Sequence, residues 1–269
     1  MPQITHLHLS AGKDGNQIPF STCGRILLSC PSLKLIALYD NILSRHSEVA
    51  DQRVTHTNLE SIFILGNMLK VSQFLVYVNA PNLHELVMSP VVGGDFRKLA
   101  DLPLSACQNK FRSLTKLTLG PAHSISLTWL HKASDYFPNV ETLIFSNLYP
   151  IQFTQQFTCR PQLFPNMKHL GLTGVRQAFV PIVLDLAEMR KEQFEGAATR
   201  LEKLSIDSGS YERLRGSVEQ NKERLKRLGL DVVRADLWEE QRLQAMYTKN
   251  KYLFGGETDV ETDVDTADN

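Results

Sequence analysis

The sequence predicts an α/β solenoid, in which short parallel strands alternate with helices or irregular turns along the chain. One observation is that residues 138–145, PNVETLIF, and residues 165–172, PNMKHLGL, share a pattern 165 − 138 = 27 residues apart. A second is that an apolar residue, two free positions, an apolar residue, one free position and a third apolar residue recur nine times. A period of about 20–50 residues is typical of repeat architectures.

The nine copies cover nearly the whole chain, so we expect one solenoid of about nine irregular repeats over residues 1–254. Successive copies start between 24 and 34 residues apart. A composition of 42% hydrophobic and 22% charged residues is in the range of folded globular proteins. The copies are Ile4-Leu7-Leu9, Leu33-Ile36-Leu38, Leu59-Ile62-Ile64, Leu83-Leu86-Met88, Leu114-Leu117-Leu119, Val140-Leu143-Phe145, Met167-Leu170-Leu172, Leu201-Leu204-Ile206 and Leu225-Leu228-Leu230.

Each copy predicts one strand, because alternation directs its second and third apolar residues inward and the residues between them to the other face. Parallel pairing of such strands requires crossover segments. Apolar residues at three- and four-residue intervals predict helices over Phe96–Gln108, Leu127–Tyr136 and Phe179–Phe194. The segment Tyr149–Pro165 contains three prolines and is expected to cross in an extended form or as a single turn.

Prolines and the C-terminal residues complete the expected organisation. Prolines stand two residues before four of the copies and are expected to end the preceding turns: Pro31, Pro81, Pro138 and Pro165. Residues 235–248, with Leu237 and Trp238 on one face, predict an amphipathic helix that caps the solenoid. Residues 255–269 form an expected disordered acidic tail, since 257–269 contain six acidic residues and no base or aromatic.

The spacing of the copies resembles the leucine-rich-repeat family, in which the segment L-x-x-L-x-L forms one strand per repeat along a horseshoe. Asn41 and Asn67 occupy the asparagine position of that family, three residues after the last apolar residue of their copies. The resemblance implies a curved parallel sheet on the concave side of a leucine-rich-repeat solenoid (horseshoe). It also implies helices or irregular turns on the convex side.

Irregular repeats and strand entries of the form P-N-V/M-x-x-L also look like the repeat regions of fungal F-box proteins. That resemblance implies a substrate-recognition region of a ubiquitin-ligase receptor, in which an N-terminal F-box would bind the adaptor of a cullin-based ligase. The first copy here starts at Ile4, and the F-box itself is absent from this chain. The alternative is a stand-alone leucine-rich-repeat protein that regulates or inhibits an intracellular enzyme.

The cysteines and the N-terminus favour the cytoplasm or the nucleus. Cys23, Cys30, Cys107 and Cys159 form no C-x-x-C pair and no cluster at the ends of the array. The opening MPQITHLHLS lacks the pattern of a signal peptide, and no apolar stretch is long enough for a membrane helix. No P-loop, G-x-S-x-G, H-E-x-x-H or Rossmann glycine pattern occurs, so we expect no enzyme and no cofactor.

The sequence disfavours two further kinds of site, a metal site and a nucleic-acid-binding surface. His6 and His8 share one face of a strand, but zinc needs three or four ligands and nothing nearby completes the set. Basic residues such as Arg224 and Arg227 are interleaved with acids, whereas a phosphate-binding surface concentrates one sign of charge. We therefore expect no metal site and a monomer that binds neither nucleic acid nor membranes.

The free positions of the strands point to a protein-binding surface on the concave face. An apolar patch with two aromatic rings is expected across three adjacent strands, formed by Leu35, Tyr39, Phe63, Leu65 and Val87. Aromatic residues supply much of the energy of protein interfaces, so a protein partner is expected here. The alternative is that the chain itself covers this patch, either with the loop 41–58 or with the C-terminal tail.

Overall fold

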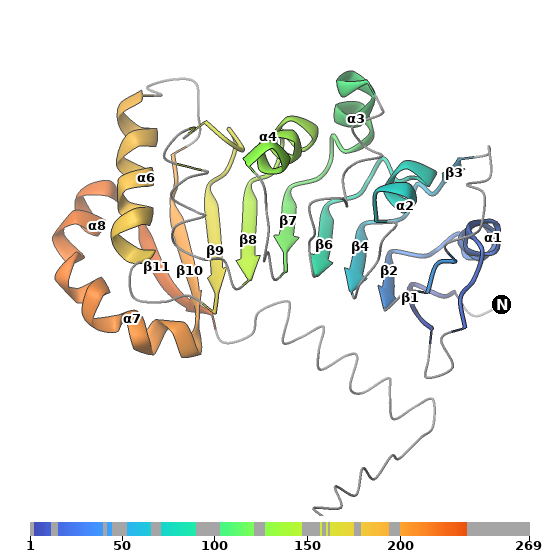
Figure 1. The fold of residues 1–269 in the computed structure, drawn as a ribbon, viewed down its shortest axis with the longest axis horizontal. Coiled ribbons are helices and arrows are strands. Elements are labelled where there is room, and N and C mark those ends of the chain that lie inside the picture. Colours follow the sequence, from blue (N-terminus) through green and yellow to red (C-terminus); the bar gives the residue numbers. More distant parts are fainter. Residues whose placement is uncertain are drawn as a thin grey trace, which may run out of the picture. The chain divides into compact units, whose positions relative to one another are not determined.

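The computed structural model describes residues 3–11, 16–39, 42–44, 53–65, 71–89, 103–120, 127–146, 157, 160, 162–174, 179–193 and 200–235 (Figure 1). The chain divides into two compact units, Met1–Ala235 and Asp236–Asn269. Every described residue belongs to the first unit. The expected tail at 255–269 lies outside the described residues, as does the expected helix at 235–248 apart from Ala235.

The first unit is an α/β structure built on one parallel sheet of nine strands. The strands follow one another in sequence order across the sheet, because each connecting segment returns the chain beside the strand it has just left. A separate pair consists of β3 (Val54–Thr55) and β5 (Val78–Asn79). The nine strands are β1 (His6–Ser10), β2 (Leu35–Tyr39), β4 (Ser61–Leu65), β6 (Glu85–Ser89), β7 (Lys116–Leu119), β8 (Thr142–Ser146), β9 (His169–Thr173), β10 (Lys203–Asp207) and β11 (Asp231–Ala235).

Helices occupy several of the connecting segments. The helix predicted over Leu127–Tyr136 has those bounds in the structure, and the one predicted from Phe179 ends at Gln193. The helix predicted from Phe96 is described only from Leu104, and most of the segment 149–165 lies outside the described residues. The described helices are α1 (Phe20–Ser29), α2 (Val71–Tyr77), α3 (Leu104–Lys110), α4 (Leu127–Tyr136), α6 (Phe179–Gln193), α7 (Ser208–Gln220) and α8 (Lys222–Leu228).

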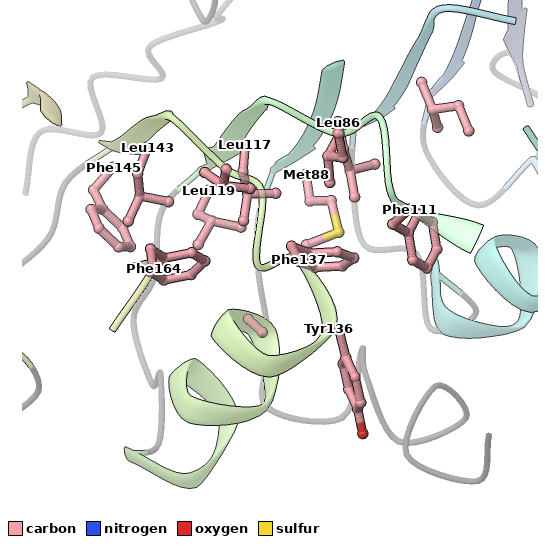
Figure 2. Packing of buried hydrophobic residues seen from close by; sticks show 14 of the residues in the cluster. Leu86, Met88, Phe111, Leu117, Leu119, Tyr136, Phe137, Leu143, Phe145 and Phe164 are labelled. Carbon is pink, nitrogen blue, oxygen red and sulfur yellow. The ribbon is translucent and has the colours of Figure 1, made fainter. Parts of the chain in front are cut away.

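The hydrophobic core lies on one face of the sheet. The second and third apolar residues of the copies, such as Leu143 and Phe145, point into it, as the strand period of two requires (Figure 2). All seven described helices contribute buried side chains to the same core. Phe137, just after α4, packs edge-on against Phe111 with ring centroids 5.1 Å apart. Each such buried side chain contributes about 1.5–3 kcal/mol relative to exposure.

The ninth copy, Leu225-Leu228-Leu230, does not form the strand that the pattern predicted. Leu225 and Leu228 lie in α8 and face the core at helical spacing, and Gly229 ends that helix with φ +60, a conformation that glycine adopts without strain. The ninth strand is β11, in which Val232 is the register partner of Leu204. The sequence prediction was wrong because an apolar pair three residues apart fits a helix as well as a repeat.

A ladder of side-chain hydrogen bonds joins the entries of successive strands. In each rung, the residue just before a copy donates to a carbonyl oxygen two residues before the preceding copy. Asparagine side chains can satisfy turn carbonyls in this way without interrupting the strand. The rungs are Asn58 Nδ2 to Pro31 O (2.9 Å), Asn82 Nδ2 to Thr57 O (2.8 Å), Ser113 Oγ to Pro81 O (2.8 Å), Asn139 Nδ2 to Arg112 O (2.8 Å) and Asn166 Nδ2 to Pro138 O (3.0 Å).

The ladder was not expected from the sequence, which pointed instead to Asn41 and Asn67. These two asparagines lie outside the described residues. Beyond Asn166 a buried arginine takes over: Arg190 of α6 donates to Leu163 O at 3.1 Å and, through Nη2, to Phe164 O and Pro165 O at 3.2 Å. The carbonyls that precede the strands are thus held by side chains from β2 to β9.

Candidate functional site: the non-core face of the sheet

The candidate site is the face of the nine-stranded sheet opposite the core, here called the non-core face. Register places its side chains in rows that run across the strands. The first row is His6, Leu35, Ser61, Glu85, Lys116, Thr142, His169, Lys203 and Asp231. The middle row is His8, Ala37, Phe63, Val87, Thr118, Ile144, Gly171, Ser205 and Val233.

The middle row is closed to solvent except at the two edge strands. Phe63 is 5% exposed and Val87 1%, and the other interior members are also buried, whereas His8 and Val233 are half-buried. A residue of an interior strand has neighbours on both sides, which an edge residue lacks. None of the interior middle-row side chains belongs to the core cluster, so their burial is separate from the core.

This burial corrects the expectation of an exposed apolar patch. Leu35, Tyr39, Phe63, Leu65 and Val87 do lie on one face of β2, β4 and β6, where Tyr39 is the register partner of Leu65 and Phe63 that of Val87. Four of the five are buried, however, and only Leu65 is half-buried. These four side chains are therefore covered within the chain itself. Strand alternation predicted their face but could not predict this coverage.

At the edge of the sheet, His8 forms a ring pair with Tyr39. Its Nδ1 lies 2.9 Å from the Tyr39 hydroxyl, and the two rings stack with centroids 5.8 Å apart. Burial, and secondarily the charge of His6, lower the pKa of His8. His6 Nδ1 lies 3.0 Å from the Thr5 hydroxyl. Within the described ranges, no group of three or more His, Cys, Asp or Glu side chains could hold a metal ion.

The first row of the non-core face is polar and at least partly accessible from β4 to β11. Glu85 Oε1 and Lys116 Nζ form an ion pair at 2.7 Å, and Ser61 Oγ donates to Glu85 Oε2 at 3.4 Å. Lys203 is exposed and makes no ion pair with any residue in the described part of the chain. The far end of this face therefore carries an accessible cation that is not paired with any described residue.

His169 and Ser205 form a close polar contact on this face. The imidazole Nε2 lies 2.6 Å from Ser205 Oγ, and Gly171, the register partner of Ser205, has no side chain to compete for that space. Burial, and then the charges of Lys203 and Lys116, lower the pKa of His169 to about 4. The imidazole is therefore neutral at physiological pH.

A serine beside a histidine raises the question of nucleophilic catalysis, and the geometry argues against it. A general base works best with a pKa near the operating pH, far above that of His169. No described carboxylate orients the other ring nitrogen, as the base of a Ser-His-Asp triad requires. Ser205 is also 4% exposed. The pair is better suited to holding a ligand by hydrogen bonds than to attacking one.

Two hydroxyls of this face are buried without a hydrogen-bond partner, Thr118 Oγ1 and Thr173 Oγ1. Sequence reasoning placed Lys203, Ser205 and His169 on this face but did not pair them. The spacing of the copies contained a signal for this contact. Aligning the two copies places Lys203 beside His169 and Ser205 beside Gly171, so that His169 and Ser205 are diagonal neighbours. A contact of this kind still depends on rotamers, which the spacing does not determine.

Comparison with known proteins adds no family to this description. No protein-family model matches the chain, and no curated protein matches it either. Among the described helices, none combines the length and the apolar character needed to cross a membrane.

Proposed function

We propose that this chain is a protein-protein interaction scaffold of the leucine-rich-repeat type, with the nine-stranded sheet as the concave side of a solenoid. The observation that carries the proposal is the strict sequence order of the parallel strands, with all described helices buried against one face. None of the described helices lies on the other face, and repeat proteins use broad surfaces of this kind for binding.

The contact surface that we propose is the accessible part of the non-core face. It includes the first row from β4 to β11 together with Leu65, the half-buried member of the apolar group on β2, β4 and β6. The buried rings of Tyr39 and Phe63 then support this surface from below. A single apolar residue beside a polar row is consistent with a regulated rather than an obligate interface, because obligate interfaces are more apolar.

Within this proposal, the more specific role is that of the substrate-recognition region of an F-box-type ubiquitin-ligase receptor. Support comes from the P-N-V/M-x-x-L entries, whose asparagines Asn139 and Asn166 form rungs of the ladder. The alternative is a stand-alone regulator or inhibitor of an intracellular enzyme. The reading frame upstream of Met1 discriminates between them, because only the first role requires an F-box there.

Affinity capture from cells with quantitative mass spectrometry tests the proposal. The baits are the full chain, Leu65→Asn on the non-core face, and Leu28→Asn as a matched control, since Leu28 is 63% exposed on α1. We expect specific partners whose recovery falls with Leu65→Asn and persists with Leu28→Asn. Recovery of a ligase adaptor and cullin supports the ubiquitin role. Equal recovery with both variants contradicts binding through the non-core face.

A further inference from the structure

We propose that the charged half of the non-core face recognises an acidic side chain of the partner, through Lys203 and the His169-Ser205 pair. This inference rests on the proposed function and specifies the chemistry of its partner. The receptor lies in the first row over β8, β9 and β10, where Thr142, His169 and Lys203 are successive register partners. All three side chains are at least partly accessible.

The electrostatic environment of this segment favours an anion. Lys116 and Lys203 stand on the two sides of His169 in the same row. Glu85 is paired with Lys116, and Asp231, the register partner of Lys203, is exposed and forms no ion pair with it. The last row of the non-core face holds the residues at the ends of the strands, such as Tyr39, Leu65 and Asp207. Asp207 already accepts hydrogen bonds from Gly174 N and Ser210 N, both at 2.9 Å. Besides burial, the charges that act on His169 are the two lysines. A partner carboxylate above His169 would therefore meet a positive potential.

The hydrogen-bonding groups of this segment fit the same ligand. In the tautomer in which Nε2 of His169 accepts the Ser205 proton, Nδ1 carries the ring hydrogen and is a donor. The Lys203 ammonium is a second donor, and hydrogen bonds between ionised groups and their partners are stronger than neutral ones. A carboxylate bound there would gain both donors while displacing only water from an accessible row.

The single ammonium of Lys203, which no described carboxylate pairs, matches a singly charged carboxylate better than a doubly charged phosphate. The position of Leu65 adds a constraint on the partner, because five strand spacings of about 4.8 Å separate β4 from β10. Leu65 also lies four residues further along its strand than Lys203 does along its own, at about 3.3 Å per residue. Together these two offsets place Leu65 and Lys203 roughly 27 Å apart. An extended segment covers that distance in about eight residues. We therefore expect the partner to carry Asp or Glu about eight residues from an apolar anchor.

Selection from a random peptide library displayed on phage, with the full chain as bait, tests this inference. The variant is Lys203→Gln, and the matched control is Arg215→Gln, which removes an exposed positive charge from α7. We expect peptides enriched by the unmodified chain to contain an apolar residue and an acidic residue at the stated spacing. Lys203→Gln should weaken an acidic peptide about tenfold, and Arg215→Gln should leave its affinity unchanged.

Replacing the acidic residue of that peptide with its amide should also lower the affinity about tenfold. Combining this replacement with Lys203→Gln should cause little further loss, because both changes remove the same interaction. Bound carboxylate should raise the pKa of His169 in an NMR titration. Enriched peptides without an acidic preference, or equal weakening by Lys203→Gln and Arg215→Gln, would overturn this inference and leave the proposed function standing. Failure to enrich any peptide would count against the proposed function as well.

Discussion

The side-chain amide of Asn139 donates to the carbonyl oxygen of Arg112 at 2.8 Å and so joins the entries of β7 and β8. It is one of five consecutive rungs between β2 and β9. The ladder holds the turns that set each strand beside its neighbour. It therefore positions the rows of the non-core face, although it lies outside them.

Asn139→Ala should lower the free energy of unfolding by about 0.5–1.5 kcal/mol, the usual net value of one hydrogen bond. Asn139 is exposed, so water can partly replace its amide. Asn109→Ala is the matched control, because Asn109 is exposed on α3 outside the ladder and its loss should change stability by less than about 0.5 kcal/mol. Urea unfolding followed by circular dichroism measures both, and equal effects would mean that the ladder adds nothing.

Leu143→Ala should lower the free energy of unfolding by about 2–5 kcal/mol, because Leu143 is fully buried in the core near the middle of the sheet. The same truncation at Leu28, which is mostly exposed, should have a much smaller effect. Thermal unfolding is the measurement. A melting temperature for Leu143→Ala close to that of Leu28→Ala would mean that the register of β8 is wrong.

Phe63→Ser should also destabilise the fold, by about 3 kcal/mol or more, since a buried ring is lost and a hydroxyl is left in its place. The exposed patch expected from the sequence would have let Tyr39 and Phe63 be replaced without loss of stability, and their burial reverses that expectation. Tyr39→Phe, which removes only the hydroxyl near His8, should cost far less. Retention of full stability by Phe63→Ser would show that the middle row is open.

Arg190→Met should cost about 2–5 kcal/mol, because it leaves the carbonyls of Leu163 and Phe164 without their buried donor. Burial lowers the pKa of Arg190 to about 10, so the group remains charged at neutral pH. Arg190→Lys should restore only part of the loss, since an ammonium cannot reproduce the spacing of the guanidinium donors. Chemical denaturation of the two variants tests this, and full restoration by lysine would contradict it.

Most strands of the sheet could be predicted from the sequence, but less of the candidate site could. Eight of the nine copies form the strands that they predict, because alternating apolar residues such as Leu143 and Phe145 determine both the strand and the face that it turns to the core. The ninth failed because Leu225 and Leu228 fit a helix equally well. The coverage of Phe63, the rung from Asn139 to Arg112 and the contact of His169 with Ser205 all depend on residues far apart in sequence, which local pattern does not specify.

Stability should depend on pH through His169. Its pKa falls from 6.5 to about 4 on folding, so between these values the unfolded chain binds a proton that the folded chain does not. This group therefore destabilises the fold as the pH drops from about 6.5 toward 4. His169→Gln should reduce that loss, whereas His84→Gln, at an exposed histidine, is the control. Unfolding free energies measured across this range would contradict the assignment if both variants followed the unmodified chain.

Binding through the non-core face is the central claim, and site-specific photo-crosslinking in cells tests it most directly. A photoreactive amino acid is placed at position 142, in the first row on β8, or at position 215, on the exposed surface of α7. Both Thr142 and Arg215 are accessible positions outside the hydrophobic core. We predict that a partner protein is crosslinked from position 142 and not from position 215. Crosslinking from position 215 alone, or equally from both, would contradict the claim.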